Sequence, residues 1–234
     1  MKNIFAEYKI DDYRVIVLKV LEDNFVYFVC LGNKAILIDA GEAKPILEFV
    51  NERKIELLQI LITHNHSDHI NGCQHLLNHI GVHSRSPAVA EEEIKILNTT
   101  CLIISTPGHS AIHKSFYFPD LKIVFTGDLL INGGCGRVID GSIEKLFKSL
   151  NKIKNLPNEI LVFGGHNYLE NNLNFALSVK PNLNYFKKRL EIFRSHPKDA
   201  LFVKLEDEKK TNIFLQCKNL NEFIILRKKK DFFN

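Results

Sequence analysis

The chain has 234 residues, of which 45% are hydrophobic and 25% are charged, and this ordinary globular composition excludes a wholly disordered chain or a fibre. The formal net charge of +4 is uneven, because residues 180–234 carry 14 Lys and Arg against 7 Asp and Glu, which leaves −3 on the first 179 residues. No apolar run approaches the roughly 18–20 residues of a membrane span and the N-terminus lacks an apolar signal core, so we expect a cytoplasmic protein without a membrane segment.

Strands dominate the first part of the chain. Alternating and continuous apolar runs predict four of them, at Arg14–Val20, Phe25–Leu31, Ala35–Asp39 and Leu57–Thr63. A helix begins near Pro45, since proline is tolerated in a first helical turn, and a second helix is expected over about Ile70–Ile80.

The same arrangement repeats in the next part. Strands are expected at 101–105, 114–118 and 122–126, then a helix over 142–154 with Ser142 as its N-cap, and a last strand at Ile160–Phe163. Two passes of mixed strands and helices predict an α/β fold in which two sheets pack together with helices outside.

After Tyr168 the pattern becomes helical. Helices are expected at Leu169–Val179 and Leu183–Arg194, followed by a charged loop at Lys204–Lys210 and a short helix from about Asn219. We therefore divide the chain into a catalytic domain, 1–168, and a helical substrate-binding domain, 169–234.

The five cysteines are scattered and form no CxxC pair. This predicts reduced thiols rather than a disulfide framework. They are Cys30, Cys73, Cys101, Cys135 and Cys217.

The strongest chemical signal is the segment Thr63-His64-Asn65-His66-Ser67-Asp68-His69. It places four potential metal ligands within six residues, directly after a buried strand. His64 and His66 project to the same side of an extended chain. Imidazole nitrogen and carboxylate oxygen together suit zinc, and also iron or manganese. Histidines without such neighbours are expected to be ordinary core or surface residues: His75, His79, His83, His113 and His196.

Three further candidates each follow a predicted strand. They are His109 in TPGHS, Asp128 in TGD and His166 in GGH. Small residues beside each one let the backbone approach a shared centre. Each motif alone is equally consistent with a plain turn, but together with the first segment they predict one metal site at the edge of a sheet.

The order of these motifs resembles the metallo-β-lactamase superfamily, whose hallmark is HxHxDH followed by a later His, Asp and His. Within it, the chain is most similar to glyoxalase II, the hydroxyacylglutathione hydrolases. The similarity extends over nearly the whole chain from about Arg14. The motifs that carry it are Asp23-Asn24-Phe25, TPGHS, FTGD, Gly134-Cys135-Gly136-Arg137, Gly165-His166-Asn167-Tyr168, Thr211-Asn212-Ile213-Phe214-Leu215 and the closing LRxxKDxF.

The resemblance implies a four-layer αβ/βα sandwich with a small C-terminal helical domain, and a centre for two divalent metal ions. Zinc is the first expectation for both ions, with iron or manganese as alternatives. The first ion would be bound by His64, His66 and His109. The second would be bound by Asp68, His69 and His166, with Asp128 bridging the two.

The resemblance also implies an activity, the metal-dependent hydrolysis of S-(2-hydroxyacyl)glutathione thioesters such as S-D-lactoylglutathione. The products are glutathione and a 2-hydroxy acid, in the second step of methylglyoxal detoxification. Asp68 and Asp128 would be the catalytic carboxylates. Contacts to the glutathione part are implied for Arg137, Tyr168, Arg227 and Lys230.

The chain departs from the family pattern at several positions. Val138-Ile139 replace the usual aromatic residue, Ile213 stands where proline is usual, and Gln216 where arginine is usual. The helical domain is also shorter than is typical. These departures leave the acyl preference open.

Two other enzymes remain as alternatives. One is a persulfide dioxygenase-like oxidoreductase with a single iron, but such enzymes lack the helical tail with LRxxKD. The other is a nucleic-acid-processing metallohydrolase, indicated only by the basic tail, whose relatives carry an inserted domain for which this chain has no room. We therefore expect a small-molecule glutathione thioester as partner, no nucleic acid, no membrane, and a monomer.

Overall fold

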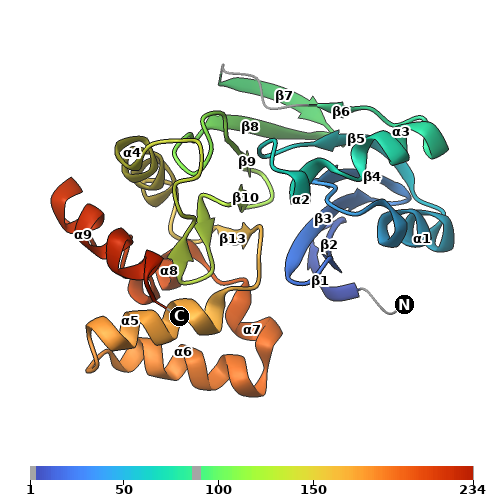
Figure 1. Ribbon diagram of the computed structural model, residues 1–234. Coiled ribbons are helices and arrows are strands. Elements are labelled where there is room, and N and C mark those ends of the chain that lie inside the picture. Colours follow the sequence, from blue (N-terminus) through green and yellow to red (C-terminus); the bar gives the residue numbers. More distant parts are fainter. Residues whose placement is uncertain (1–3, 86–90, 234) are drawn as a thin grey trace.

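Two β-sheets lie face to face with helices on their outer surfaces, and a group of helices closes one end of the molecule (Figure 1). The computed structural model describes residues 4–85 and 91–233. This confirms the predicted α/β sandwich with a helical C-terminal part.

The first sheet has the strand order β1-β2-β3-β4-β5-β6. Its strands are antiparallel up to β4, and β4, β5 and β6 are parallel neighbours, because helix α1 carries the chain back between β4 and β5. The elements of this half are β1 (Ile4–Ile10), β2 (Tyr13–Val20), β3 (Asn24–Leu31), β4 (Lys34–Ile38), α1 (Ala43–Arg53), β5 (Glu56–Leu61), α2 (Ser67–Ile70), α3 (Cys73–Ile80) and β6 (Ser84–Arg85).

The second sheet has the order β13-β10-β9-β8-β7, and a two-stranded ribbon, β11-β12, lies beside it. Helix α4 covers its outer side (Figure 1). Ser142 caps that helix as predicted, since its hydroxyl accepts from the Lys145 amide. The elements are β7 (Glu92–Ile96), β8 (Thr99–Ser105), β9 (Lys114–Phe118), β10 (Ile123–Gly127), β11 (Leu130–Ile131), β12 (Gly134–Cys135), α4 (Ile143–Lys154) and β13 (Leu161–Gly164).

Strand β3 is one unbroken apolar run because both of its faces are buried. Phe25, Tyr27 and Val29 point into the core shared with the second sheet. The alternate residues Val26 and Phe28 point into a separate core under helix α1. A strand that is buried on both faces has no reason to alternate with polar residues.

The named elements of the described C-terminal residues, 169–233, are all helices. They are α5 (Leu169–Val179), α6 (Asn184–Ser195), α7 (Pro197–Leu201), α8 (Leu205–Thr211) and α9 (Leu220–Asp231). Within residues 4–85 and 91–233, no helix is both long and apolar enough to span a bilayer.

The predicted charged loop at Lys204–Lys210 is wrong, because this segment forms helix α8. Its buried side includes Leu205, Glu208 and Thr211, which recur every third residue. Glu208 is buried because it pairs with Arg189 of α6 at 2.7 Å. The helix could not be recognised from apolar spacing, because one of its buried positions is a charged residue.

The predicted helix over Ile70–Ile80 is divided into α2 and α3. The break lies at Gly72, whose amide donates to the Ala40 carbonyl at 2.7 Å. A Cβ atom at this position would lie 2.7 Å from the same oxygen, so only glycine fits the close approach.

Candidate metal centre

The HxHxDH segment is held in place by an acid at the end of the neighbouring strand. Asp39 follows β4, and its carboxylate accepts from the Thr63 amide and from the Thr63 hydroxyl, both at 2.8 Å. The chain then passes His64 and His66 before it turns into helix α2, which carries Asp68 and His69.

The structure brings all seven predicted metal ligands together. In the first group, Nδ1 of His66 lies 3.0 Å from Nε2 of His64 and 3.0 Å from Nε2 of His109. In the second group, Oδ2 of Asp68 lies 3.4 Å from Nε2 of His69 and 3.3 Å from Nε2 of His166. Each group could hold one ion.

Asp128 lies between the two groups. Its Oδ2 is 3.5 Å from Nε2 of His109 in the first group and 3.2 Å from Nε2 of His166 in the second. Its Oδ1 is 3.4 Å from Nε2 of His69. The carboxylate therefore faces histidines of both groups.

The outer nitrogen of every ligand histidine has an oxygen partner. These pairs are His64 Nδ1 with Thr63 Oγ1 (3.0 Å), His66 Nε2 with Asp140 Oδ1 (3.2 Å), His69 Nδ1 with Asp39 Oδ2 (2.9 Å), His109 Nδ1 with the Arg137 carbonyl (2.7 Å) and His166 Nδ1 with Asp23 Oδ1 (2.8 Å). Carboxylates and carbonyls only accept, and the Thr63 hydroxyl already donates to Asp39, so the outer nitrogens donate. In the neutral ring the inner nitrogen then presents a lone pair, as a metal ligand must.

The inner atoms fit a cation. Nε2 of His69 and Oδ1 of Asp128 are buried and have no hydrogen-bond partner among the described residues. When the rings are neutral, lone pairs of nitrogen and oxygen face one another around both groups, an arrangement that costs free energy unless a positive charge lies between them. A divalent ion with imidazole and carboxylate ligands satisfies all of these atoms.

The charges of the site favour a cation as well. Burial lowers the pKa of His166, but the charge of Asp128 and the hydrogen bonds to it and to Asp68 outweigh burial and raise that pKa to about 10. Burial raises the pKa of Asp128, but His69 and His166 outweigh burial and hold it well below its usual range. The negative charge that attracts a proton here would stabilise a metal ion in the same place.

Glycines let the backbone close around Asp128. A Cβ atom on Gly165 would lie 2.4 Å from its Oδ1, and a Cβ atom on Gly136 would lie 2.1 Å from its carbonyl oxygen. Either substitution would displace the carboxylate, because these distances are far below van der Waals contact.

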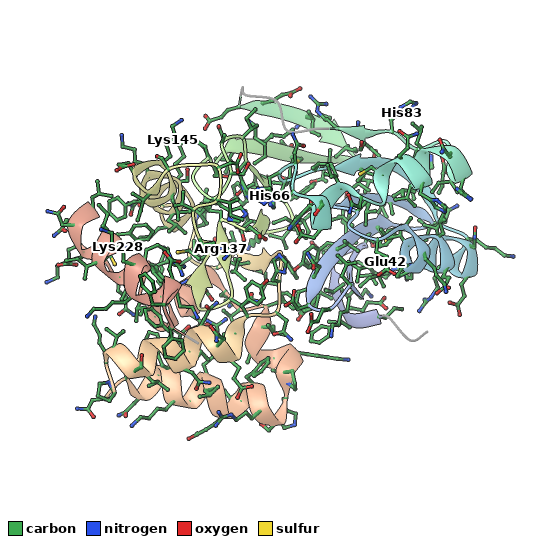
Figure 2. All side chains as sticks on the ribbon, in the orientation of Figure 1. Glu42, His66, His83, Arg137, Lys145 and Lys228 are labelled. Carbon is green, nitrogen blue, oxygen red and sulfur yellow. The ribbon has the colours of Figure 1, made fainter. Side chains whose placement is uncertain are left out.

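A cavity of about 570 Å³ opens onto both groups. All four predicted substrate contacts line it, together with ligands of both groups. The lining residues are His66, Asp68, His109, Asp128, Ile131, Cys135, Gly136, Arg137, Ile139, His166, Tyr168, Asn171, Asn172, Arg227 and Lys230. Figure 2 shows His66 and Arg137 in the middle of the molecule, where the sheets meet the helical part.

The four predicted substrate contacts have different surroundings. Arg137 is exposed, and the ring of Tyr168 stacks on His166 with centroids 4.7 Å apart. Nζ of Lys230 donates to Asn171 Oδ1 and lies over the ring of Phe175. Burial, and then the nearby Arg227 charge, lower the pKa of Lys230 to about 8.

Arg227 is the most enclosed of the four. Its guanidinium is buried, donates to the Cys135 carbonyl at 2.8 Å, and pairs with Asp231 at 3.0 Å. It also lies over the Phe214 ring. These contacts brace the wall of the cavity, so Arg227 supports the shape of the cavity as well as its charge.

Sequence reasoning overlooked several residues of the centre. Asp39 and Asp140 are ordinary single acids in the sequence, and Asp23 is part of a family motif to which no role was attached. Asp39 follows β4, Asp23 lies between β2 and β3, and Asp140 lies in the loop before α4, so no shared local pattern marks them as partners of the ligands. His113 is also close: it is buried, bonds Thr106 Oγ1 at 2.9 Å, and stacks on His64.

The thiols have no disulfide partners, and all five cysteines lie within the described residues. Cys135 is in the cavity wall, where burial raises its pKa to about 11.

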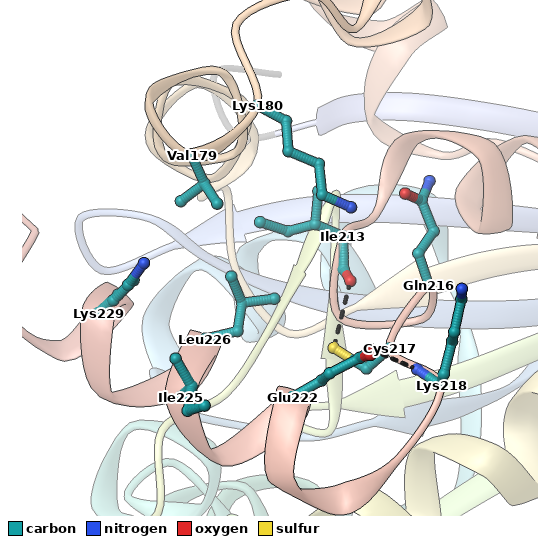
Figure 3. A pocket seen from close by; sticks show the side chains of 10 residues that line it. All are labelled: Val179, Lys180, Ile213, Gln216, Cys217, Lys218, Glu222, Ile225, Leu226 and Lys229. Carbon is teal, nitrogen blue, oxygen red and sulfur yellow. Dashed lines mark hydrogen bonds between the residues drawn. The ribbon is translucent and has the colours of Figure 1, made fainter.

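A second cavity, of about 410 Å³, lies against the other side of α9 (Figure 3). It is lined by Val179, Lys180, Ile213, Gln216, Cys217, Lys218, Glu222, Ile225, Leu226 and Lys229. No predicted site residue is among them, so the chemistry belongs to the first cavity.

Comparisons with known proteins agree with this arrangement. Residues 21–95 and 92–166 match the metallo-beta-lactamase superfamily, and residues 167–233 match the hydroxyacylglutathione hydrolase C-terminus. The hydroxyacylglutathione hydrolase of Haemophilus ducreyi is 36% identical over 232 residues, which cover 93% of this chain and 98% of that protein. The enzyme of the same name from Buchnera aphidicola subsp. Baizongia pistaciae is 36% identical over 248 residues, which cover 93% and 99%.

Among solved structures, ETHE1 from Myxococcus xanthus superposes with a TM-score of 0.65 at 21% identity, covering 96% of this chain and 90% of that one. The BLEG-1 B3 metallo-beta-lactamase superposes with a TM-score of 0.66 at 20% identity, covering 88% and 100%. These likenesses show the fold.

Proposed function

Because the chain belongs to the hydroxyacylglutathione hydrolases of the metallo-β-lactamase superfamily, we propose that its divalent metal centre holds two ions through the seven predicted ligands. The enzyme hydrolyses the thioester of S-(2-hydroxyacyl)glutathione, such as S-D-lactoylglutathione, to glutathione and a 2-hydroxy acid. In this family the reaction completes the detoxification of methylglyoxal.

The observation that carries the two-ion proposal is the position of Asp128. Its carboxylate oxygens face the first group, His64, His66 and His109, through His109, and face the second group, Asp68, His69 and His166, through His69 and His166. A centre for one ion would not need a buried carboxylate between two sets of lone pairs.

The ligand chemistry favours zinc. Five imidazoles and two carboxylates offer only nitrogen and oxygen, which zinc accepts readily in hydrolases. The same set accepts iron and manganese, so these metals are the alternatives to be distinguished by analysis of the purified protein.

The chain's own residues prepare the reaction. When bound, divalent ions lower the pKa of a water molecule toward 7 and polarise a carbonyl oxygen. Asp68 and Asp128 are the proposed catalytic carboxylates, since both line the cavity. The leaving thiolate has an ordinary pKa near 8.5, so it departs without a general acid from the protein.

The glutathione part would lie against the wall that meets the helical domain. Arg137 and Lys230 offer positive charge to its carboxylates, and Tyr168 offers a ring and a hydroxyl. Arg227 supports this wall from behind through Cys135. On this basis residues 1–168 form the catalytic domain, and residues 169–234 complete the substrate site.

The remaining expectations are part of the same proposal: a monomer in the cytoplasm that acts on a small molecule, without nucleic acid or membrane as partner. Only part of the basic run at residues 227–230 supports a site for a small anionic molecule. Lys230 lines this cavity, whereas Lys228 and Lys229 are exposed and do not line it. An iron dioxygenase is the rival, and it would consume oxygen where this enzyme releases glutathione.

The test combines metal analysis with steady-state hydrolysis of S-D-lactoylglutathione on one sample. We expect two ions per chain, release of glutathione without oxygen uptake, and loss of most metal and activity in Asp128→Ala. Full activity in protein that holds well under one ion per chain would refute the metal centre.

A further inference from the structure

The loop between β12 and α4 touches the first ligand group at several points. The Arg137 carbonyl accepts from Nδ1 of His109 at 2.7 Å, and the Ile139 amide donates to the His109 carbonyl at 3.0 Å. Three residues after Arg137, Oδ1 of Asp140 lies 3.2 Å from Nε2 of His66. The same loop thus contacts two of the three histidines in that group.

Asp140 also joins two loops. Its Oδ2 accepts from the Ala111 amide at 3.3 Å, in the segment that follows His109. The carboxylate therefore bridges His66, from the first sheet, and the loop after β8, from the second sheet.

His66 differs from the other ligand histidines in its exposure. Its side chain is 24% exposed, whereas those of His64, His69, His109 and His166 are between 0% and 5% exposed. Close packing restricts the four buried rings. His66 precedes helix α2 as its N-cap residue and lines the cavity, and because it is the most exposed of the five, packing restricts it least.

We propose that Asp140 is a positioning residue that holds the His66 ring with Nδ1 facing His64 and His109. By accepting from Nε2, it selects the tautomer in which Nδ1 carries the lone pair. Because Asp140 is 54% exposed, the attraction between the two side chains adds little stability to the fold, and its effect is on the orientation of the ring. This inference rests on the proposed metal centre.

The loop between β12 and α4 also links the first ligand group to the cavity. Arg137 and Ile139 line the substrate cavity, while Asp140 and the Arg137 carbonyl hold histidines of the first group. The segment that meets the substrate is therefore the segment that orients the first-group ligands.

The test measures metal affinity directly. Metal-free protein is titrated with Co²⁺ and with Zn²⁺ against a chromophoric chelator, for the wild type, Asp140→Ala, Asp140→Asn and Glu144→Ala. Glu144 is the matched control, an exposed acid four residues further along that has the same charge. Mutating a residue that hydrogen-bonds to a metal-binding histidine typically lowers metal affinity about 10- to 100-fold.

We expect Asp140→Ala to weaken one of the two ions by about 10- to 100-fold and to leave the other within about twofold. Asp140→Asn keeps an oxygen for His66 and should recover part of the loss, while Glu144→Ala binds like the wild type. The kcat of Asp140→Ala should fall at low metal and recover with excess metal, with KM nearly unchanged.

Two ions bound by Asp140→Ala with wild-type affinity would overturn the positioning role while leaving the metal centre intact. An equal loss in Glu144→Ala would also overturn it, because the effect would then be one of charge alone. Fewer than two ions in the wild type would instead refute the two-ion proposal on which this inference rests. If Asp140→Ala does not fold, Asp140→Asn and Glu144→Ala decide the matter by the same titration.

Discussion

Lys230 is the residue through which the substrate assignment is best tested. Its amine is half-buried, bonded to Asn171 and placed over the rings of Phe175 and Phe233, so it is fixed in the wall of the cavity before any ligand arrives. Replacing it by alanine removes a positive charge without touching a metal ligand.

The size of the effect follows from that geometry. A hydrogen bond to a charged group contributes about 1.5–3 kcal/mol. This corresponds to a rise of roughly 10- to 150-fold in KM for Lys230→Ala. The kcat should change much less, because the lost contact is the same in the ground state and in the transition state.

The lowered pKa adds a pH dependence with a definite sign. An amine with a pKa of about 8 is mostly protonated at pH 7 and mostly neutral at pH 9. Its attraction for a carboxylate is therefore present at pH 7 and is lost as the pH rises through 8. We expect the KM of the wild type to rise over this interval, and that of Lys230→Arg to rise less, because arginine stays charged.

The assay compares S-D-lactoylglutathione with a small neutral thioester. The loss should be confined to the glutathione substrate, and Lys228→Ala, an exposed lysine on the same helix (Figure 2), should behave like the wild type. Unchanged KM values for both substrates in Lys230→Ala would refute our reasoning about the cationic wall.

Three other substitutions test the centre and the fold. His64→Ala should lower hydrolysis by several orders of magnitude with an unchanged circular dichroism spectrum, while His75→Ala, on an exposed helix face, keeps wild-type activity; equal losses would contradict our choice of ligands. Arg189→Ala leaves the Glu208 carboxylate buried without its partner, and urea titration should show a loss of about 3–5 kcal/mol, against no change if the pair is unimportant. Ser142→Ala removes the cap of α4 and should cost about 1 kcal/mol in the same titration, whereas Ser142→Gly costs only a few tenths.

The proposed metal ligands could be predicted because four of them lie within six residues and the other three follow strands. A buried apolar run with a polar end is visible in a sequence, and strand ends meet at one edge of a sheet. The strands of the interior, such as β3, were predictable for the same reason, since burial on both faces leaves one unbroken apolar run.

The partners of the ligands could not be found in this way. Asp39 and Asp140 contact histidines that lie 30 and 74 residues away in the chain, and nothing local distinguishes them from surface acids. The prediction of a loop in place of helix α8 was wrong for a related reason. Glu208 is buried there because it pairs with a residue of another helix. The edge strand β7 could not be predicted from apolar residues, because it is rich in exposed charges although it pairs with β8.

Arg227 shows a further limit. Its place in a basic run predicts a solvated or ligand-facing cation, yet its guanidinium is buried against Cys135 and Asp231. Only the tertiary structure reveals that the carbonyl it binds belongs to the wall of the catalytic cavity.

That wall also contains a sulfur atom, and a thioester is a substrate that sulfur can attack. Transfer of the acyl group to Cys135 would leave the enzyme acylated on itself. Thiolate is the reactive form, and a pKa raised from 9.0 to about 11 lowers its population at neutral pH by about 100-fold. Burial thus disfavours transfer of the acyl group to Cys135 and favours its hydrolysis by water.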